Sequence, residues 1–246
     1  MDRMIYTALT GMDAAMTRQR AIASNLANAS TPGFRAETFA TVPTHLPGGA
    51  LDVRGYAQGA VRGVDLGAGT MVQTGRALDI AVAGEALIAF QGENGEEVYS
   101  RRGDFSIDSA GRLVNGENLQ AMGLNGPVAV PPGWEVILGS DGNVYAADPA
   151  APDAPPTEVG RIKLASPAGS AVVKGLDNQL RVQGGGVLPA DPTAEITSGA
   201  LEGSNVDASG TLVDMIEAQR SFEQRAKLIS TAEKLDQSSA SLMSLG

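Results

Sequence analysis

The chain has 246 residues, of which 43% are hydrophobic, so it is long enough for one or two compact domains and too apolar to be intrinsically disordered. Its formal net charge of −10 argues against nucleic acid as a partner, because phosphate binding requires clustered Lys and Arg. It contains no cysteine, which excludes disulfides, thiolate metal sites and thiol nucleophiles.

The N-terminal segment carries a helical pattern. Apolar residues recur at alternating steps of four and three from residue 5 to residue 26, as they do along a coiled-coil seam. This pattern predicts a helix that ends near Asn28, and Pro32 and Gly33 predict a sharp turn after it. The apolar positions of the predicted seam are Ile5, Leu9, Met12, Met16 and Leu26.

Residues 35–70 show little periodicity. Pro43 and a Pro-Gly-Gly step at residues 47–49 interrupt them. We interpret this segment as an irregular connector with a role at the surface.

Residues 71–200 have the pattern of an antiparallel β domain. Short runs of β-prone residues, such as 78–82, 86–90 and 134–138, are separated by glycine-containing turns, and no run shows a helical period. The Asp141-Gly142 pair predicts a type I′ hairpin turn. We therefore expect a Gly-rich, twisted β domain over these residues.

The C-terminal segment is helical in pattern again. The helix is expected over about residues 211–245, with Ser209 or Thr211 as its cap. Its apolar stripe is narrow, so this helix needs partner helices from its own chain or from other chains. The stripe consists of Leu212, Met215, Phe222 and Ile229.

The fold class that these elements predict is α+β. Segments 1–34 and 201–246 are expected to pair as a coiled-coil-like layer, and residues 71–200 are expected to form a separate outer domain. Residues 1–35 carry four Arg against two Asp, whereas residues 201–246 carry four basic against seven acidic residues, and these opposite charges favour pairing. The unsatisfied stripes indicate assembly rather than catalysis.

No catalytic, cofactor-binding or metal-binding residue is predicted. The single histidine, His45, has no second metal-ligand motif beside it, and the chain lacks both a G-x-S-x-G elbow and a phosphate-binding G-x-x-x-x-G-K-[ST] loop. No stretch approaches the ~20 apolar residues of a membrane-spanning helix, so we expect no direct membrane insertion. On the residues alone, a secreted β-rich binding module stays open as an alternative, with its aromatic residues as the contact surface.

The segment S-N-L-A-N-A-S-T-P-G-F at residues 24–34 resembles the signature that ends the first helix of the bacterial flagellar rod and hook proteins. Four further segments resemble elements of this family in the same order along the chain, at residues 74–81, 99–105, 126–131 and 199–206. The short length and the opening residues are similar to those of the proximal rod type, with a distal rod or hook-type subunit as the alternative. The signature residues are Asn25, Leu26, Asn28, Thr31, Pro32, Gly33, Phe34, Ser204, Asn205 and Val206.

The resemblance implies a structural role in the flagellar basal body. Members of this family polymerise helically into the rod that joins the membrane rotor to the distal rod and hook. The expected partners are copies of the chain itself, other proximal and distal rod subunits, and the flagellar type III export apparatus. The expected location is the periplasm-spanning rod, reached without a cleaved signal peptide. In that setting the predicted seam residues of both end helices are the expected assembly interface.

Overall fold

The computed structural model of the protein describes residues 2–46 and 54–243. The chain folds into two compact units. One unit, here called the helical unit, comprises residues 1–27, 37–62 and 207–246. The other, here called the β unit, comprises residues 28–36 and 63–206.

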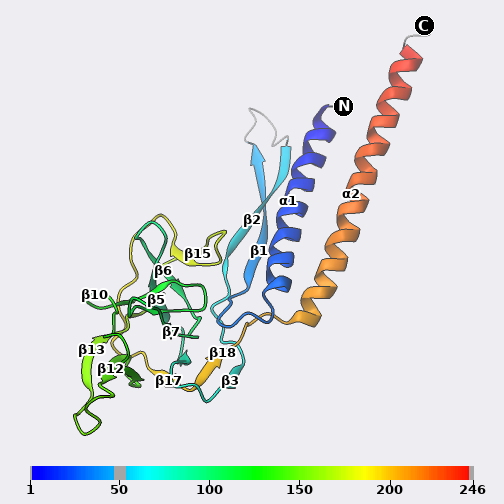
Figure 1. The fold of residues 1–246 in the computed structure, drawn as a ribbon. Helices are drawn as coiled ribbons and strands as arrows, with labels where there is room; N and C mark the ends of the chain where they lie inside the picture. Colours follow the sequence, from blue (N-terminus) through cyan, green and yellow to red (C-terminus); the bar gives the residue numbers. More distant parts are fainter. Residues whose placement is uncertain (1, 47–53, 244–246) are drawn as a thin grey trace. The chain divides into compact units, whose positions relative to one another are not determined.

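The helical unit is built on the two ends of the chain. Helix α1 (Asp2–Ala27) and helix α2 (Ala208–Met243) run side by side, as Figure 1 shows in blue and orange-red. This arrangement confirms the predicted pairing of the terminal segments and, with the β-rich middle, the α+β class. The cap of α2 differs from the prediction, because it is Asp207 whose carboxylate accepts hydrogen bonds from the backbone N–H groups of Ser209 and Gly210, at 3.1 and 3.2 Å. A carboxylate at this position also interacts favourably with the positive end of the helix dipole.

The segment expected to be irregular, residues 35–70, holds two long strands. Strands β1 (Glu37–Leu46) and β2 (Arg54–Val64) pair as a two-stranded sheet, and β1 contacts α1. The prediction of an irregular connector is therefore wrong for the strand residues, while residues 47–53 lie outside the described part of the chain. Pro43 was one of the residues that made this segment look irregular. Proline has no backbone N–H, but each strand of a two-stranded sheet has one edge without a partner strand, and proline is tolerated where its nitrogen faces such an edge.

The β unit consists of short strands that pair with antiparallel neighbours. The largest sheet has nine strands in the order β15-β16-β6-β5-β9-β8-β7, with β10 paired to β9 and β14 paired to β5. A second sheet has the order β11-β12-β13, and the pairs β17-β4 and β18-β3 complete the unit. The strand bounds are β3 (Met71–Gln73), β4 (Ile80–Val82), β5 (Leu87–Gln91), β6 (Glu97–Ser100), β7 (Ser106–Ile107), β8 (Leu113–Val114), β9 (Gln120–Gly123), β10 (Gly126–Pro127), β11 (Glu135–Leu138), β12 (Asn143–Ala147), β13 (Thr157–Arg161), β14 (Leu164–Ala165), β15 (Val172–Lys174), β16 (Leu180–Val182), β17 (Ile196–Ser198) and β18 (Ala200–Glu202).

Strand β5 is buried on both faces and organises two apolar cores. Its alternate residues Ile88 and Phe90 enter the larger core, where the rings of Phe90 and Phe105 lie 5.8 Å apart between centroids. Leu87 and Ala89 point to the opposite face and enter the smaller core. This double burial explains why residues 86–90 form a continuous apolar run instead of alternating with polar residues.

The unit boundaries differ from the sequence-based division at 34/35 and 200/201. Residues 28–36 and 201–206 both belong to the β unit, because they hydrogen-bond to each other and to the neighbouring loops. The Gly33 N–H, for example, donates to the Glu202 carbonyl oxygen at 2.7 Å. The chain therefore leaves and re-enters the helical unit through two segments that are tied together inside the β unit.

Candidate assembly interface

Small residues lie where α1 and α2 approach each other, since Ala14 and Ala218 line the same cavity. Ala14 of α1 and Ala218 of α2 are buried, and so is Gly11. Arg225 of α2 donates from Nη1 to the Gly11 carbonyl oxygen at 2.5 Å, and a Cβ atom at residue 11 would lie 2.7 Å from that nitrogen. The glycine that lowers helix propensity in α1 is thus the point at which an arginine of α2 approaches its backbone.

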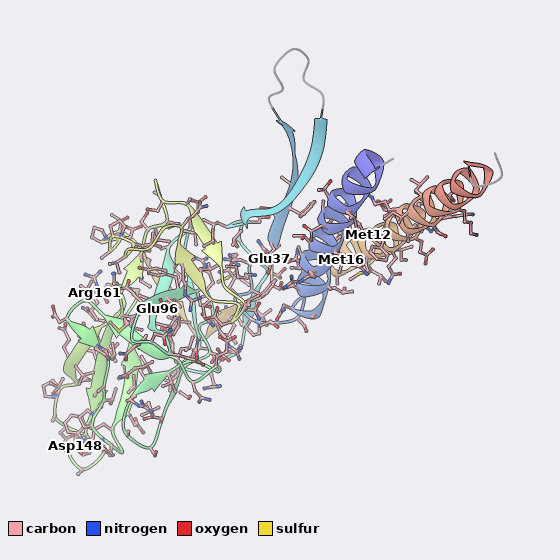
Figure 2. The ribbon with its side chains drawn as sticks, turned by 90° about the horizontal axis from the view of Figure 1, so that it is seen from above. Met12, Met16, Glu37, Glu96, Asp148 and Arg161 are labelled. Carbon is pink, nitrogen blue, oxygen red and sulfur yellow. The ribbon has the colours of Figure 1, made fainter. Side chains whose placement is uncertain are left out.

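The predicted seam residues differ in how far their side chains are exposed. Leu9, Met16 and Leu212 are each about half exposed, at 49%, 51% and 52%. Five others are half-buried, namely Met12, Leu26, Met215, Phe222 and Ile229, and the side chain of Ile5 lies outside the described residues. Figure 2 labels Met12 and Met16 on α1.

Further large apolar residues of α2 are exposed that the predicted seam did not include. They follow the helix from its first turns, and Val213 and Ile216 are 56% and 44% exposed. Leu228 lies farther along and is 67% exposed. Such a row of exposed apolar side chains on paired helices is typical of a surface that another protein covers.

The end of α1 is attached to the start of β1 by a side-chain amide that makes the pair of hydrogen bonds a neighbouring β-strand would make. Asn25 accepts a hydrogen bond on Oδ1 from the Glu37 N–H at 2.8 Å and donates from Nδ2 to the Glu37 carbonyl oxygen at 3.0 Å. The Ser24 hydroxyl also donates to the Glu37 carboxylate, at 3.1 Å. Glu37, labelled in Figure 2, is therefore held by two consecutive residues of the signature segment.

The signature residues after α1 form a turn inside the β unit. The Phe34 N–H donates to the Thr31 carbonyl oxygen at 3.3 Å, with Pro32 and Gly33 as the central residues. Gly33 has φ of 69°, so this Pro-Gly pair has the pattern of a type II turn. A Cβ atom on Gly33 would lie 2.3 Å from the backbone nitrogen of Arg102, so space and backbone conformation both require glycine.

Three charged side chains are buried next to this turn, and we call them the Glu202 cluster. They are Arg35, Arg101 and Glu202, each no more than 2% exposed. Glu202 accepts on Oε1 from Arg35 Nη2 at 2.6 Å and from the Gly69 N–H at 2.7 Å, and it accepts on Oε2 from Arg101 Nε at 2.7 Å.

Arg101 completes its bonding with the carbonyl oxygens of Val82 and Ala86, at 2.7 and 2.5 Å. Burial lowers the pKa of Arg101 from its ordinary value, and the charge of Glu202 opposes that shift. The carboxylate thus holds together four segments that are distant in sequence.

Asn205 provides a second connection between the same segments. Its Oδ1 accepts from the Ala36 N–H at 2.7 Å, and its Nδ2 donates to the carbonyl oxygens of Asp65 and Gly67 at 2.9 and 3.0 Å. Its own N–H donates to the Phe34 carbonyl oxygen at 3.3 Å. One signature residue near the entry to α2 thereby fixes the chain that follows α1.

The remaining signature residues have local roles. The Ser204 hydroxyl accepts from the Val206 N–H at 3.2 Å, and the Thr31 hydroxyl donates to Asn28 Oδ1 at 3.1 Å. Lys174 lies over the ring of Phe34, with Nζ 3.4 Å from the ring centroid. The structure therefore brings Gly33, Phe34 and Asn205 together and places the seam residues on the helical unit.

Sequence analysis missed the three charged residues of the Glu202 cluster. A signal was present, because each one stands inside or beside a segment that resembles the family: Arg35 directly follows the signature turn, and Arg101 and Glu202 lie in the segments at 99–105 and 199–206. A charged residue embedded in such a segment can be buried in the fold as well as exposed on its surface. Only the three-dimensional pairing distinguishes the two.

Within the described residues, no group of three or more His, Asp or Glu side chains is placed to hold a metal ion. Among the described helices, neither is apolar enough over a sufficient length to cross a bilayer.

Comparison with known proteins gives a consistent result along the chain. Three family models match: "Flagella basal body rod protein" at residues 5–35, "Flagellar hook protein FlgE/F/G D1 domain" at residues 81–146, and "Flagellar basal body rod FlgEFG protein C-terminal" at residues 197–242. The chain is 39% identical over 239 residues to the flagellar basal-body rod protein FlgF of Escherichia coli (strain K12), covering 95% of both chains. It is 35% identical to the Salmonella typhimurium FlgF over the full length of both chains, and 31% identical to the Agrobacterium fabrum FlgG over 95% of this chain and 96% of that protein.

Proposed function

The chain belongs to the FlgF type of flagellar basal-body rod proteins and is a structural rod subunit, and we propose that it polymerises through the exposed apolar faces of α1 and α2. The observation that carries this proposal is a difference between the small and the large apolar residues of the two helices. Small residues such as Ala14 and Ala218 are buried where α1 and α2 approach each other, whereas large residues such as Leu9, Met16 and Ile216 stay about half exposed. In a monomer these side chains gain nothing from being apolar, but in a polymer they become the contact between copies.

The energy of such a contact is modest for each residue and large for the assembly. Full burial of a large aliphatic side chain contributes about 1.5–3 kcal/mol, so covering one that is half exposed contributes about 1 kcal/mol. A helical polymer repeats the contact at every subunit, and each copy meets several neighbours. Many weak contacts then give a stable rod while single subunits stay separable before assembly.

The partners in this proposal are copies of the same chain and other rod subunits. The similarity to proteins named FlgG extends over nearly the whole chain, which supports neighbours that present similar terminal helices. We place the subunit in the proximal part of the rod, reached through the flagellar type III export apparatus. The role is structural rather than catalytic, because the buried charged groups of the Glu202 cluster are engaged in fixed pairs that join chain segments.

The proposal is tested by two matched substitutions on α2. Ile216→Asp places a charge in the exposed apolar row, and Ile216→Leu keeps the same position apolar. Each variant replaces the chromosomal copy in the motile source bacterium, and motility and the composition of isolated basal bodies are measured. We expect Ile216→Asp to abolish motility and to be missing from basal bodies, while Ile216→Leu remains motile. Normal incorporation of Ile216→Asp, with an unchanged fold, would overturn the proposed interface.

A further inference from the structure

The β unit contains a small cavity beside the signature turn. Its volume is about 20 Å³, which is room for about one water molecule. Phe34 and Arg35 of the segment after α1 line one part of it, and Asn178 and Gln179, which precede β16, line another. Arg102 also reaches its wall. The cavity thus lies where the chain leaving α1 meets the β15–β16 hairpin.

Two buried polar atoms belong to residues that line this cavity and have no hydrogen-bond partner among the described residues. One is Arg35 Nε, which is a donor, and the other is Gln179 Oε1, which is an acceptor. Both residues are nearly inaccessible, at 2% and 4% exposure. An unsatisfied buried group is costly, so each of these atoms calls for a partner that the protein itself does not supply.

Neither side chain is free to turn toward another protein group. The guanidinium of Arg35 is fixed by its Nη2 contact to Glu202 at 2.6 Å. The amide of Gln179 is fixed by its Nε2 contact to Glu117, so its oxygen keeps its direction. Exchanging the amide oxygen and nitrogen of Gln179 would direct an oxygen at the Glu117 carboxylate, which is unfavourable.

The chemistry of the two atoms selects the ligand. A cation is repelled by the guanidinium of Arg35, and a halide ion cannot donate a hydrogen bond to Gln179 Oε1. A water molecule accepts from Arg35 Nε–H and donates to Gln179 Oε1 at the same time. We propose that this cavity is a specific binding site for one internal water molecule that bridges Arg35 and Gln179.

The bridge would fasten the segment after α1 to the β15–β16 hairpin. It would act beside a direct link between the same parts, in which Lys174 donates to the Arg35 carbonyl oxygen. Arg35 would then be satisfied by Glu202, by the protein backbone around it and by the bound water. The inference rests on the packing of the β unit and does not depend on how the rod assembles.

The direct test is a crystal structure of the full chain in its monomeric form at better than about 1.8 Å, with a second crystal soaked in sodium bromide. We expect a single water peak within hydrogen-bond distance, about 2.7–3.2 Å, of both Arg35 Nε and Gln179 Oε1. Featureless density between two well-ordered side chains would overturn the proposal. A bromide anomalous peak at this position would also overturn it, because it would identify an anion site.

A solution measurement gives an independent test. Oxygen-17 magnetic relaxation dispersion counts the internal water molecules with long residence times, and we compare the unaltered chain with Gln179→Met and Gln120→Met. Gln179→Met removes the acceptor and should lower the count by one. Gln120→Met also replaces a half-buried glutamine, whose Nε2 donates to the Val128 carbonyl oxygen outside the cavity, and should leave the count unchanged. An equal count in all three proteins would refute the bridge, and the crystal structure of the unaltered chain decides the matter should Gln179→Met fail to fold.

Discussion

Substitution of Glu202 by glutamine tests the buried cluster on which the β unit depends. The change preserves the shape of the side chain but removes the negative charge that lies between the buried guanidinium groups of Arg35 and Arg101. It also replaces one of two oxygens that accept hydrogen bonds at 2.6–2.7 Å by an amide nitrogen that can only donate. Removing one partner of a buried ion pair costs about 3–5 kcal/mol, and because glutamine keeps one acceptor we expect about 3 kcal/mol.

The measurement is guanidinium chloride and thermal unfolding, followed by the fluorescence of Trp134. This residue is the only tryptophan of the chain and packs against the larger core of the β unit. A loss of about 3 kcal/mol corresponds to a fall of about 6–12 °C in the melting temperature of a domain of this size. The control is Glu135→Gln on β11, where the side chain is exposed and the change should stay within about 0.5 kcal/mol. Equal stabilities of the two variants would refute the argument that the cluster stabilises the fold.

Two further predictions concern single positions in the β unit. Gly33→Ala and Gly75→Ala introduce the same methyl group at nearly the same φ, 69° and 74°, but only the first meets a backbone atom, the Arg102 nitrogen at 2.3 Å. Gly75→Ala should therefore lose about 1 kcal/mol in urea unfolding and Gly33→Ala at least about 2 kcal/mol more, and similar losses would contradict the close approach. The second prediction concerns acid stability, because the hydrogen bonds from Arg181 hold the pKa of Asp177 below its usual 3.8. A carboxyl with a lowered pKa stabilises the folded state above 3.8 and loses that effect as the pH falls through its folded value, so the unaltered protein should lose more stability than Asp177→Asn between pH 4 and pH 2. The difference should be at most about 0.5 kcal/mol, since the ion pair is partly exposed, and parallel pH profiles would contradict it.

The extent of the helices could be predicted from the sequence, whereas the face used for their contact could not. Apolar periodicity places α1 and α2 because large residues dominate any count of hydrophobic positions. Gly11, Ala14 and Ala218 are buried where the two helices approach each other, and such small residues contribute little to such a count. The approach of the two helices also involves Arg225, which donates a hydrogen bond to a backbone carbonyl oxygen of α1. Such a bond cannot be recognised from the pattern of side chains in a sequence. The large apolar residues remain the predicted interface between copies.

Local turn chemistry was predicted in part. The Thr31–Phe34 turn follows directly from Pro-Gly, whereas the type I′ turn expected at Asp141-Gly142 is wrong. Gly142 has φ of 84°, but Asp141 is not among the residues with positive φ. The Gly142 N–H donates to the Gly139 carbonyl oxygen at 3.0 Å and the Gly139 N–H to the Asn143 carbonyl oxygen at 2.9 Å, which describes a three-residue loop with a left-handed glycine. The strand register that selects this longer loop is set by Leu138 facing Val144, a pairing that the dipeptide alone does not reveal.

The strands of residues 37–46 and 54–64 and the Glu202 cluster escaped prediction for a common reason. Both depend on a partner outside the segment itself: β1 pairs with β2, the next strand along the chain, and Glu202 pairs with Arg35, which is 167 residues away. Pairing supplies the free energy that local propensity lacks, as it does for most β structure. In a single sequence each member of such a pair is seen without its partner, so nothing indicates that the two will interact.

The most direct test of the assembly interface is the association of purified full-length protein. Sedimentation velocity over a range of concentrations, followed by electron microscopy of the concentrated samples, is carried out for the unaltered chain, for Leu9→Asp and for Leu9→Ile. We predict that the unaltered chain and Leu9→Ile form large elongated assemblies as concentration rises, and that Leu9→Asp stays a folded monomer throughout. Assemblies of the same size and shape in Leu9→Asp would show that the exposed apolar face of α1 is not the surface that joins the subunits.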